Sequence, residues 1–144
     1  MPLEGTYEPG TWDWSNDHVD RYESSGGTKG LTIQGMPVVV LWTRGRRTGA
    51  VRKGPVMRVK NGDRYAVVAS KGGSPQHPEW YLNLAADPHV TLQDGPEVGD
   101  YIAHTATPEE RAAWWTRATA VYPPYDDYQA KTDREIPVVI LEPA

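Results

Sequence analysis

The sequence predicts a mainly β domain of the α+β class, a small barrel of about six antiparallel strands with a few short helices. Three observations predict this fold. Residues 37–43 form a β-branched apolar run, the dipeptide Asn61-Gly62 separates two strand-like runs, and prolines open or end the short helical segments. The 144 residues have the size of one domain. We expect residues 28–144 to form the barrel and residues 1–27 to form an N-terminal helical extension.

The strands follow from local composition in chain order. The run Pro37-Val-Val-Val-Leu-Trp-Thr43 is nearly all apolar, which is typical of a strand buried on both faces. A glycine-bracketed turn over residues 44–49 comes next, and Asn61-Gly62 is the strongest short-range signal for a hairpin. The six expected strands cover residues 37–43, 51–59, 64–70, 89–93, 98–105 and 137–141.

Proline and capping residues define two helices after the first hairpins. Residues 77–86 predict a helix of about two turns with Pro78 at its first helical position, and Pro88 ends it. Thr107-Pro-Glu-Glu110 is a capping box, because the threonine hydroxyl and the glutamate three residues later satisfy each other's backbone amides. It opens a helix that runs toward Val121.

The composition excludes most self-contained catalytic chemistry. The chain has no cysteine, which removes thiolate metal sites and thiol nucleophiles. Its four histidines lack ligand spacing, so we expect no metal, and no Gly-x-Ser-x-Gly, phosphate-loop or dinucleotide motif occurs. Any redox chemistry therefore needs a bound cofactor. No apolar run has the length of a transmembrane helix and the acidic N-terminus does not resemble a signal peptide, so the expected location is the cytoplasm.

Charge is distributed unevenly along the chain. Residues 29–71 contain ten basic residues and one acidic residue, Asp63, although the net charge of the whole chain is −4. A basic segment within an acidic protein indicates a local anionic ligand. The net negative charge of the whole chain argues against nucleic acid as the partner. A solvated strand face is the alternative that the charges alone leave open.

A glycine-rich segment supplies a second candidate for anion binding. Residues 69–75 follow a strand and precede the helix near Pro78, so their backbone amides are expected to form a concave site near a helix N-terminus. Gly72 and Gly73 would let a flat ring or a phosphate approach the main chain closely. The arginine-containing turn of residues 45–49 is expected to lie beside this segment, although a plain glycine-rich loop remains the alternative.

Several motifs together resemble the deazaflavin (F420)-dependent nitroreductase family, the A branch of the flavin/deazaflavin oxidoreductases of mycobacteria and related actinobacteria. The resemblance covers about residues 28–144 and keeps the order and spacing of the motifs. It implies a split β-barrel, reduced coenzyme F420 as cofactor, and hydride transfer to an electron-poor small molecule. The motifs are Thr43-x-Gly-Arg-Arg-Thr-Gly49, Arg52, Pro55, Asn61-Gly62, Val68-Ala-Ser-Lys-Gly-Gly73, His77-Pro-x-Trp-Tyr-x-Asn-Leu84 and Lys131-Thr-Asp-Arg-x-Ile-Pro137.

The resemblance also implies which residues hold the cofactor, whose phosphate and polyglutamate tail account for a basic groove. The basic turn and the pair after it correspond to the binding site for phosphate and tail, and the remaining residues enclose the ring. The implied cofactor residues are Arg46, Arg47, Thr48, Gly49, Arg52, Lys53, Pro55, Val56, Val68, Ala69, Ser70, Lys71, Gly72, Gly73, Trp80 and Asn83.

A tyrosine-rich segment, Tyr122-Pro-Pro-Tyr-Asp-Asp-Tyr128, is expected to border the acceptor. Pro124 can begin a helix on which Tyr125 and Tyr128, three residues apart, share one face. By resemblance, these two tyrosines and Tyr122 orient the acceptor and donate a proton, together with the Ser70 hydroxyl, and Met57 lines the same pocket. The alternative is that the tyrosines only pack one end of the barrel.

The acceptor class stays broad: a conjugated lactone or enone of the coumarin or aflatoxin type, a quinone, or a nitroaromatic. Two other functions remain open, an FMN-dependent split-barrel oxidoreductase and a non-catalytic deazaflavin carrier. FMN has no acidic tail, so the basic segment argues against the first. We expect a monomer or a weak homodimer.

The N-terminal extension is expected to contain a helix over residues 15–25 that Gly26 and Gly27 end. Trp12 and Trp14 would then lie where they can cover the pocket. Contact with a membrane surface is the less favoured alternative, because the segment is short and acidic.

Overall fold

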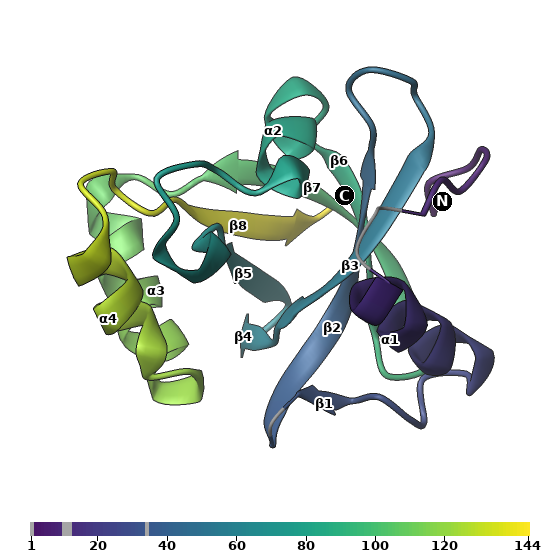
Figure 1. The fold of residues 1–144 in the computed structure, drawn as a ribbon, viewed down its shortest axis with the longest axis horizontal. Coiled ribbons are helices and arrows are strands. Elements are labelled where there is room, and N and C mark those ends of the chain that lie inside the picture. Colours follow the sequence, from purple (N-terminus) through teal and green to yellow (C-terminus); the bar gives the residue numbers. More distant parts are fainter. Residues whose placement is uncertain (1, 10–12, 34) are drawn as a thin grey trace.

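The computed structural model describes residues 2–9, 13–33 and 35–144. They form one curled antiparallel sheet with short helices around it (Figure 1). The elements in chain order are α1 (Asp13–Ser24), β1 (Thr32–Ile33), β2 (Met36–Arg44), β3 (Val51–Met57), β4 (Val59–Asn61), β5 (Arg64–Val68), the 3₁₀ turn η1 (Lys71–Gly73), α2 (Glu79–Ala86), β6 (His89–Asp94), β7 (Glu97–Thr105), α3 (Pro108–Val121), α4 (Pro124–Lys131) and β8 (Val138–Pro143).

The strand order is β1-β2-β6-β7-β8-β5-β4, and β3 pairs with β2 outside this path. Every pairing between these strands is antiparallel. Figure 1 shows α1 at one end of the molecule and the α3–α4 pair at the other, with the strands between them. The prediction of a mainly β, α+β fold with a barrel-like sheet and short helices is therefore confirmed.

The number of strands differs from the expected six, because the described residues form eight. The predicted strand 51–59 is two strands, and the chain changes partners at Arg58. Up to Met57 the residues pair with β2, whereas from Val59 they pair with β5. The Arg58 amide donates to the Pro37 carbonyl at 2.8 Å and its guanidinium binds Asp94, which fixes the crossing. The two-residue strand β1 was also not predicted.

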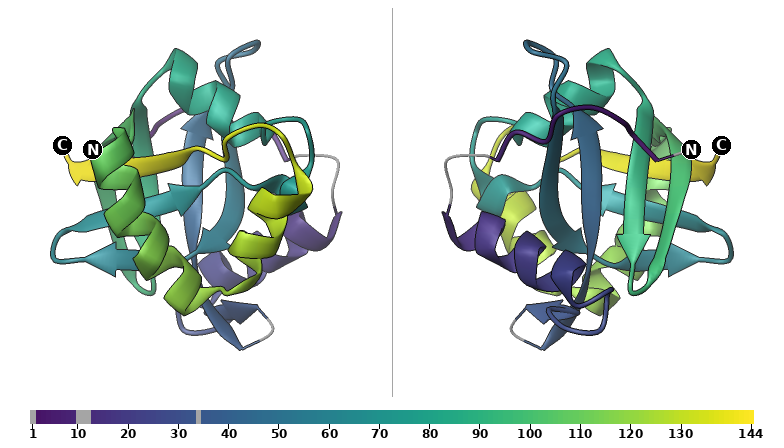
Figure 2. Two further views of the ribbon diagram at one scale, coloured as in Figure 1. Left: turned by 90° about the vertical axis from the view of Figure 1, so that its left-hand side faces the viewer. Right: turned by 90° about the vertical axis from the view of Figure 1, so that its right-hand side faces the viewer.

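The predicted hairpin at Asn61-Gly62 is confirmed. Asn61 pairs with Arg64, so Gly62 and Asp63 form the two-residue loop. Gly62 has a φ of +64°, a left-handed conformation that glycine adopts without steric cost. The β2–β3 hairpin is longer and projects beyond the rest of the molecule in every view (Figures 1 and 2).

Several central strands are buried on both faces, as residues 37–43 predicted. In β2, Val39 and Leu41 belong to the cluster inside the curled sheet, while Val38 and Val40 pack under α1. In β8, Val139 and Leu141 face the inner cluster, and Val138 and Ile140 pack under α3 and α4. Alternate side chains thus point to opposite faces, and both faces are covered.

The two helices with predicted caps are observed, one of them with a shifted start. The capping box of α3 is complete, because the Thr107 hydroxyl accepts from the Glu110 amide and the Glu110 carboxylate accepts from the Thr107 amide. In α2, Pro78 is the N-cap and not the first helical residue. Its backbone is extended with ψ 149°, and only its carbonyl joins the helix by accepting from Tyr81 and Leu82.

The helix α1 ends in a compact turn that packs on the β6–β7 loop. The Gly26 amide donates to Glu23 and the Gly27 amide donates to Tyr22, which is the bonding pattern of a Schellman cap. Tyr22 is fully buried, and its hydroxyl accepts from the Gly95 amide at 2.7 Å. α1 is therefore packed onto the sheet. Trp12 lies outside the described residues.

Candidate functional site

Three adjoining cavities of about 410, 270 and 200 Å³ form a groove between β3, α2 and the segments that flank them. The first and second share lining from Gly54 and Trp80, and the second and third share lining from Arg52 and Asn83. Glu79 lines all three. The groove is thus continuous from an apolar end to a basic end.

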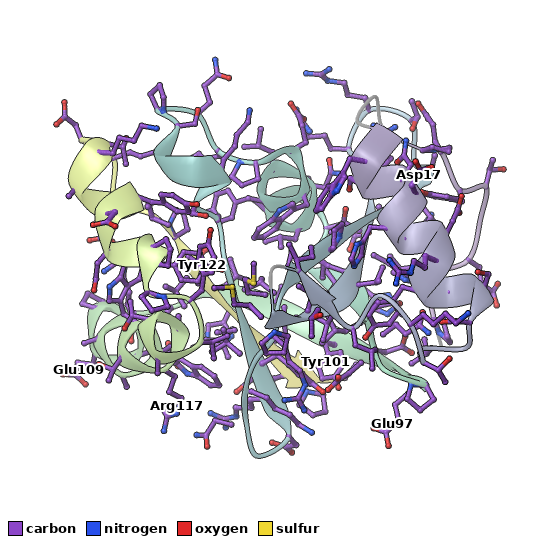
Figure 3. The ribbon with its side chains drawn as sticks, turned by 60° about the horizontal axis from the view of Figure 1, so that its bottom comes forward. Asp17, Glu97, Tyr101, Glu109, Arg117 and Tyr122 are labelled. Carbon is purple, nitrogen blue, oxygen red and sulfur yellow. The ribbon has the colours of Figure 1, made fainter. Side chains whose placement is uncertain are left out.

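The first cavity is the apolar end, and its walls come from distant parts of the sequence. Strand β3 and the η1 turn form two walls, α2 a third, and the tyrosine segment closes one end. Figure 3 shows Tyr122 on the inner side of α4, toward the strands. The predicted site residues that line this cavity are Pro55, Val56, Met57, Val68, Ser70, Lys71, Gly72, Trp80, Tyr122, Tyr125 and Tyr128.

Sequence reasoning missed several residues of this cavity. Gly54 and Pro78 flank predicted site residues, whereas Ile33 and Val38 come from the first two strands. Trp14 was predicted as a cover and does line the cavity, from α1, although 48% of its surface remains exposed. Gly54 and Pro78 lie next to recognised motifs and therefore had a local sequence signal, whereas Ile33 and Val38 reach the site through strand pairing, which local sequence does not indicate.

The η1 turn has a strained backbone. Lys71, Gly72 and Gly73 have φ values of +46°, +64° and +80°, so three consecutive residues are left-handed. Such a conformation is costly for a lysine and persists only where the surroundings enforce it. The Gly73 amide donates to the Ser70 carbonyl at 2.9 Å, which closes the turn.

Arg134, from the loop before β8, holds this turn from behind. Its guanidinium donates to the carbonyls of Ser74 at 2.8 Å, Ser70 at 2.8 Å and Ala69 at 3.1 Å. It also lies 3.3 Å from Nδ1 of His77, and the pKa of that imidazole is lowered by burial and by the guanidinium charge. One cation thus fixes the carbonyls on both sides of η1.

The tyrosines form a compact cluster in which the hydroxyl that meets Tyr128 comes from Tyr122, not from Tyr125. The Tyr122 and Tyr128 hydroxyl oxygens are 2.7 Å apart, because Tyr122 precedes α4 and lies beside its first turns. Tyr125 is 5% exposed, and burial raises the pKa of its hydroxyl. The hydrogen bond to Tyr128, together with burial, raises the pKa of Tyr122 to about 12.

We expect Tyr122 to ionise near pH 12, above its ordinary value of 10. The neutral hydroxyl is the form that the fold stabilises, so its contribution to stability is complete below pH 10 and is lost as the pH rises through about 12. The absorbance of tyrosinate during an alkaline titration measures this ionisation. Subtracting the titration of the Tyr122→Phe variant from that of the wild-type protein isolates the signal of Tyr122. In Tyr128→Phe the Tyr122 transition should move toward its ordinary value. An unchanged transition in that variant would contradict the hydrogen bond as its cause.

The third cavity is the basic end of the groove, beside the loop that joins β2 to β3. Arg46, Arg47, Thr48 and Arg52, four of the residues predicted to bind the cofactor, line it. Arg46 is held by Asn83, whose Oδ1 accepts from both the Arg46 side chain at 3.0 Å and its amide at 3.3 Å. The buried Asn83 thus orients the arginine turn.

Carboxylates of the chain itself also lie at the basic end. Arg46 Nη1 is 2.7 Å from Glu79 Oε2, and this hydrogen bond lowers the pKa of Glu79. Arg52 Nη1 is 3.0 Å from Glu8 Oε1. Arg47, which is exposed, adds to the positive potential that lowers the pKa of Glu79.

Lys53 is more enclosed than the arginines. Its ammonium is 2.9 Å from Glu23 Oε2 and lies over the rings of Trp42 at 4.1 Å and Tyr7 at 4.8 Å. Only 13% of its side chain is exposed. Lys53 lines the second cavity, yet its positive charge is already compensated by the Glu23 carboxylate of α1 and by the two aromatic rings.

Three residues predicted at the cofactor site do not line these cavities. Ala69 is fully buried behind the η1 turn. Gly73 packs against α4, where an added Cβ would lie 2.8 Å from the Tyr128 carbonyl oxygen. Gly49 is exposed in the hairpin turn, with a φ of +74°. These three residues therefore lie outside the lining of the groove.

Among residues 2–9, 13–33 and 35–144, no group of three or more His, Asp or Glu side chains is placed to hold a metal ion. Within the same ranges no helix combines the length and the apolar character needed to cross a membrane.

Comparison with known proteins gives consistent matches. The family described as F420H(2)-dependent quinone reductase matches residues 14–143. A quinone reductase of this description from Mycobacterium tuberculosis is 36% identical over 128 residues, which cover 86% of each chain. A solved F420-H2 dependent reductase (FDR-A) is 50% identical, with a TM-score of 0.70, and covers 74% of this chain and 94% of its own. A structure described as a domain-swapped dimer is 46% identical, with a TM-score of 0.73, and covers 90% of this chain and 98% of its own.

Proposed function

The chain belongs to the F420H(2)-dependent quinone reductase family, and from this premise we propose that its groove holds reduced F420 with the ring in the first cavity and the anionic end in the third. The protein is an F420-dependent oxidoreductase. The observation that carries the proposed placement is the continuity of the groove, which joins an apolar cavity with hydroxyl groups to a cluster of arginines.

The residues present fit the chemistry of this cofactor. A flat ring requires an apolar slot with a few directed polar groups, which β3, Trp80 and the η1 turn provide. A phosphate and an acidic tail require cations, which Arg46, Arg47 and Arg52 provide at the other end. Ala69, Gly73 and Gly49 would act by shaping these walls, and Lys53 by supporting the second cavity.

When bound, reduced F420 supplies a hydride to the acceptor. The chain has to align the two molecules and provide a proton, because alignment alone can lower a barrier by several kcal/mol. Tyr122 and Tyr128 share one hydrogen bond between their hydroxyls, so one of the two protons remains free to be donated. Ser70, which lines the same cavity, is the second candidate donor. Tyr125 is buried and supports the other two rings at centroid distances of 4.8 and 6.3 Å.

We propose an electron-poor small molecule as the acceptor, with a quinone favoured because the matching relatives are named quinone reductases. A conjugated lactone or enone and a nitroaromatic remain the other candidates. Met57 and Trp14 would contact the apolar part of the acceptor, since both line the first cavity. Assembly as a monomer or weak homodimer and a cytoplasmic location also remain proposals, and the solved domain-swapped dimer favours the dimer.

We expect Arg47→Ala to weaken binding of F420 about tenfold, because one charge-assisted contact with the anionic end is lost. Fluorescence titration with oxidised F420 measures the dissociation constant. Arg64→Ala is the matched control, because Arg64 is exposed on β5 and does not line the groove. Equal affinities of the two variants would contradict the placement of the anionic end.

The same protein should then be tested with FMN and with acceptors. We expect wild-type protein to bind F420 and not FMN, and to oxidise reduced F420 only when a quinone, a coumarin-type lactone or a nitroaromatic is added. Absorbance of the reduced cofactor follows this reaction. Tight FMN binding without F420 affinity would favour an FMN-dependent oxidoreductase, and F420 binding without oxidation by any acceptor would favour a carrier.

A further inference from the structure

The anion site at the basic end of the groove contains a carboxylate from the N-terminal segment. Glu8 Oε1 lies 3.0 Å from Arg52 Nη1, and Glu8 Oε2 accepts from the Thr48 hydroxyl at 3.4 Å. Glu8 therefore already binds the Arg52 guanidinium and the Thr48 hydroxyl, two groups at the end of the groove where we propose that the anionic end of F420 binds. Its side chain lines the same cavity as Arg46 and Arg47.

The backbone of Glu8 is fixed independently of its side chain. The Glu8 amide donates to the Val51 carbonyl at 2.9 Å, and the Val51 amide donates to the Thr6 carbonyl at 2.8 Å. Tyr7, between them, forms a parallel bridge with Val51. The segment is thus attached beside β3, and the carboxylate of Glu8 can leave Arg52 by rotation of its side chain alone.

The Glu8–Arg52 and Glu23–Lys53 ion pairs differ in exposure, and this difference indicates which carboxylate a ligand can displace. The side chains of Glu8 and Arg52 are 49% and 35% exposed, so water replaces the carboxylate at little cost. Glu23 and Lys53 are 25% and 13% exposed, and Lys53 also lies over two aromatic rings. A ligand carboxylate or phosphate can therefore displace Glu8, whereas it cannot readily displace Glu23.

We propose that Glu8 is a specificity-determining residue that sets how strongly a ligand with an anionic tail is preferred over the same ring without one. A ligand with an anionic tail can form contacts with Arg52 and Thr48 only if it displaces the Glu8 carboxylate. A ligand that fills only the first cavity leaves Glu8 in place and is unaffected by it. This inference rests on the proposed placement of F420 in the groove.

The test compares wild-type protein with Glu8→Gln, which keeps the size of the side chain and removes its charge. Glu4→Gln is the matched control, because Glu4 is exposed on the same segment and its side chain does not line the cavities. Dissociation constants are measured by fluorescence for two ligands: F420 with its phosphate and polyglutamate tail, and the deazariboflavin form that lacks both.

We expect Glu8→Gln to bind F420 about two- to fivefold more tightly than wild-type protein, and to bind the tail-less form with unchanged affinity. Glu4→Gln should match the wild-type protein for both ligands. The inference is overturned if Glu8→Gln behaves as Glu4→Gln does, or if Glu8→Gln binds both ligands more tightly by the same factor. In either case, binding of F420 by the wild-type protein still supports the proposed function. If the wild-type protein binds neither ligand, the proposed function fails and this inference fails with it.

Discussion

Arg134→Gln is expected to lower the free energy of unfolding by about 3 kcal/mol or more and to weaken F420 binding more than tenfold. The guanidinium donates to the carbonyls of Ser74, Ser70 and Ala69, and Ala69 and Ser70 are buried. Glutamine is too short to reach all three, so buried carbonyls would lose their partners. The left-handed turn at Lys71 would then lose the contacts that hold it against the first cavity.

Chemical denaturation and fluorescence titration measure the two effects on the same protein. Arg64→Gln is the control, because the Arg64–Glu142 pair is 3.3 Å long with side chains 52% and 43% exposed, and such a pair contributes at most about 1 kcal/mol. Equal stabilities of the two variants would show that Arg134 does not hold the turn. A destabilised Arg134→Gln with unchanged F420 affinity would separate the turn from the cofactor site.

Gly27→Ala is the second change with a large expected effect, a loss of about 3 kcal/mol or more. Gly27 has a φ of +79°, and an added Cβ would lie 1.8 Å from the Gly95 carbonyl oxygen. The three nearest atoms, which are the carbonyl oxygen and carbon of Gly95 and the nitrogen of Pro96, all belong to the backbone, so α1 and the β6–β7 loop would have to separate. The partly buried hydrogen bond between the Tyr22 hydroxyl and the Gly95 amide would then be lost.

Gly26→Ala is the matched control for this prediction. Gly26 has a φ of +66° but no atom within 4 Å of an added Cβ, so only the conformational cost of roughly 1–2 kcal/mol applies. Denaturation midpoints of the two variants give the comparison. If both lose the same stability, the close approach of Gly27 to Gly95 does not hold α1 on the sheet.

The elements that the sequence predicted well are those with local causes. The Asn61-Gly62 hairpin and the Thr107–Glu110 capping box depend on residues a few positions apart, and both are observed. The break at Arg58 depends on a hydrogen bond to Pro37 and an ion pair with Asp94, both distant in sequence. Local composition could not indicate it, because residues 51–59 read as one continuous strand.

The candidate site also combines residues that have a local sequence pattern with residues that have none. The motifs around Arg46, Ser70 and Trp80 have local patterns, and the structure brings them to one groove. The carboxylates that compensate the basic groups could not be predicted, because Glu8 lies far along the chain from Arg52 and Glu23 lies far from Lys53. That these residues hold F420 stays a prediction until binding is measured.

The position of β8 has a consequence for how the chain folds as it is synthesised. Residues 138–143 fill the gap between β5 and β7, and their side chains complete the clusters on both faces of the sheet. Until this segment is synthesised, β5 and β7 each lack a neighbouring strand on one side, and an unpaired strand edge favours association with other chains. The sheet therefore closes only after residues 138–143 have been synthesised.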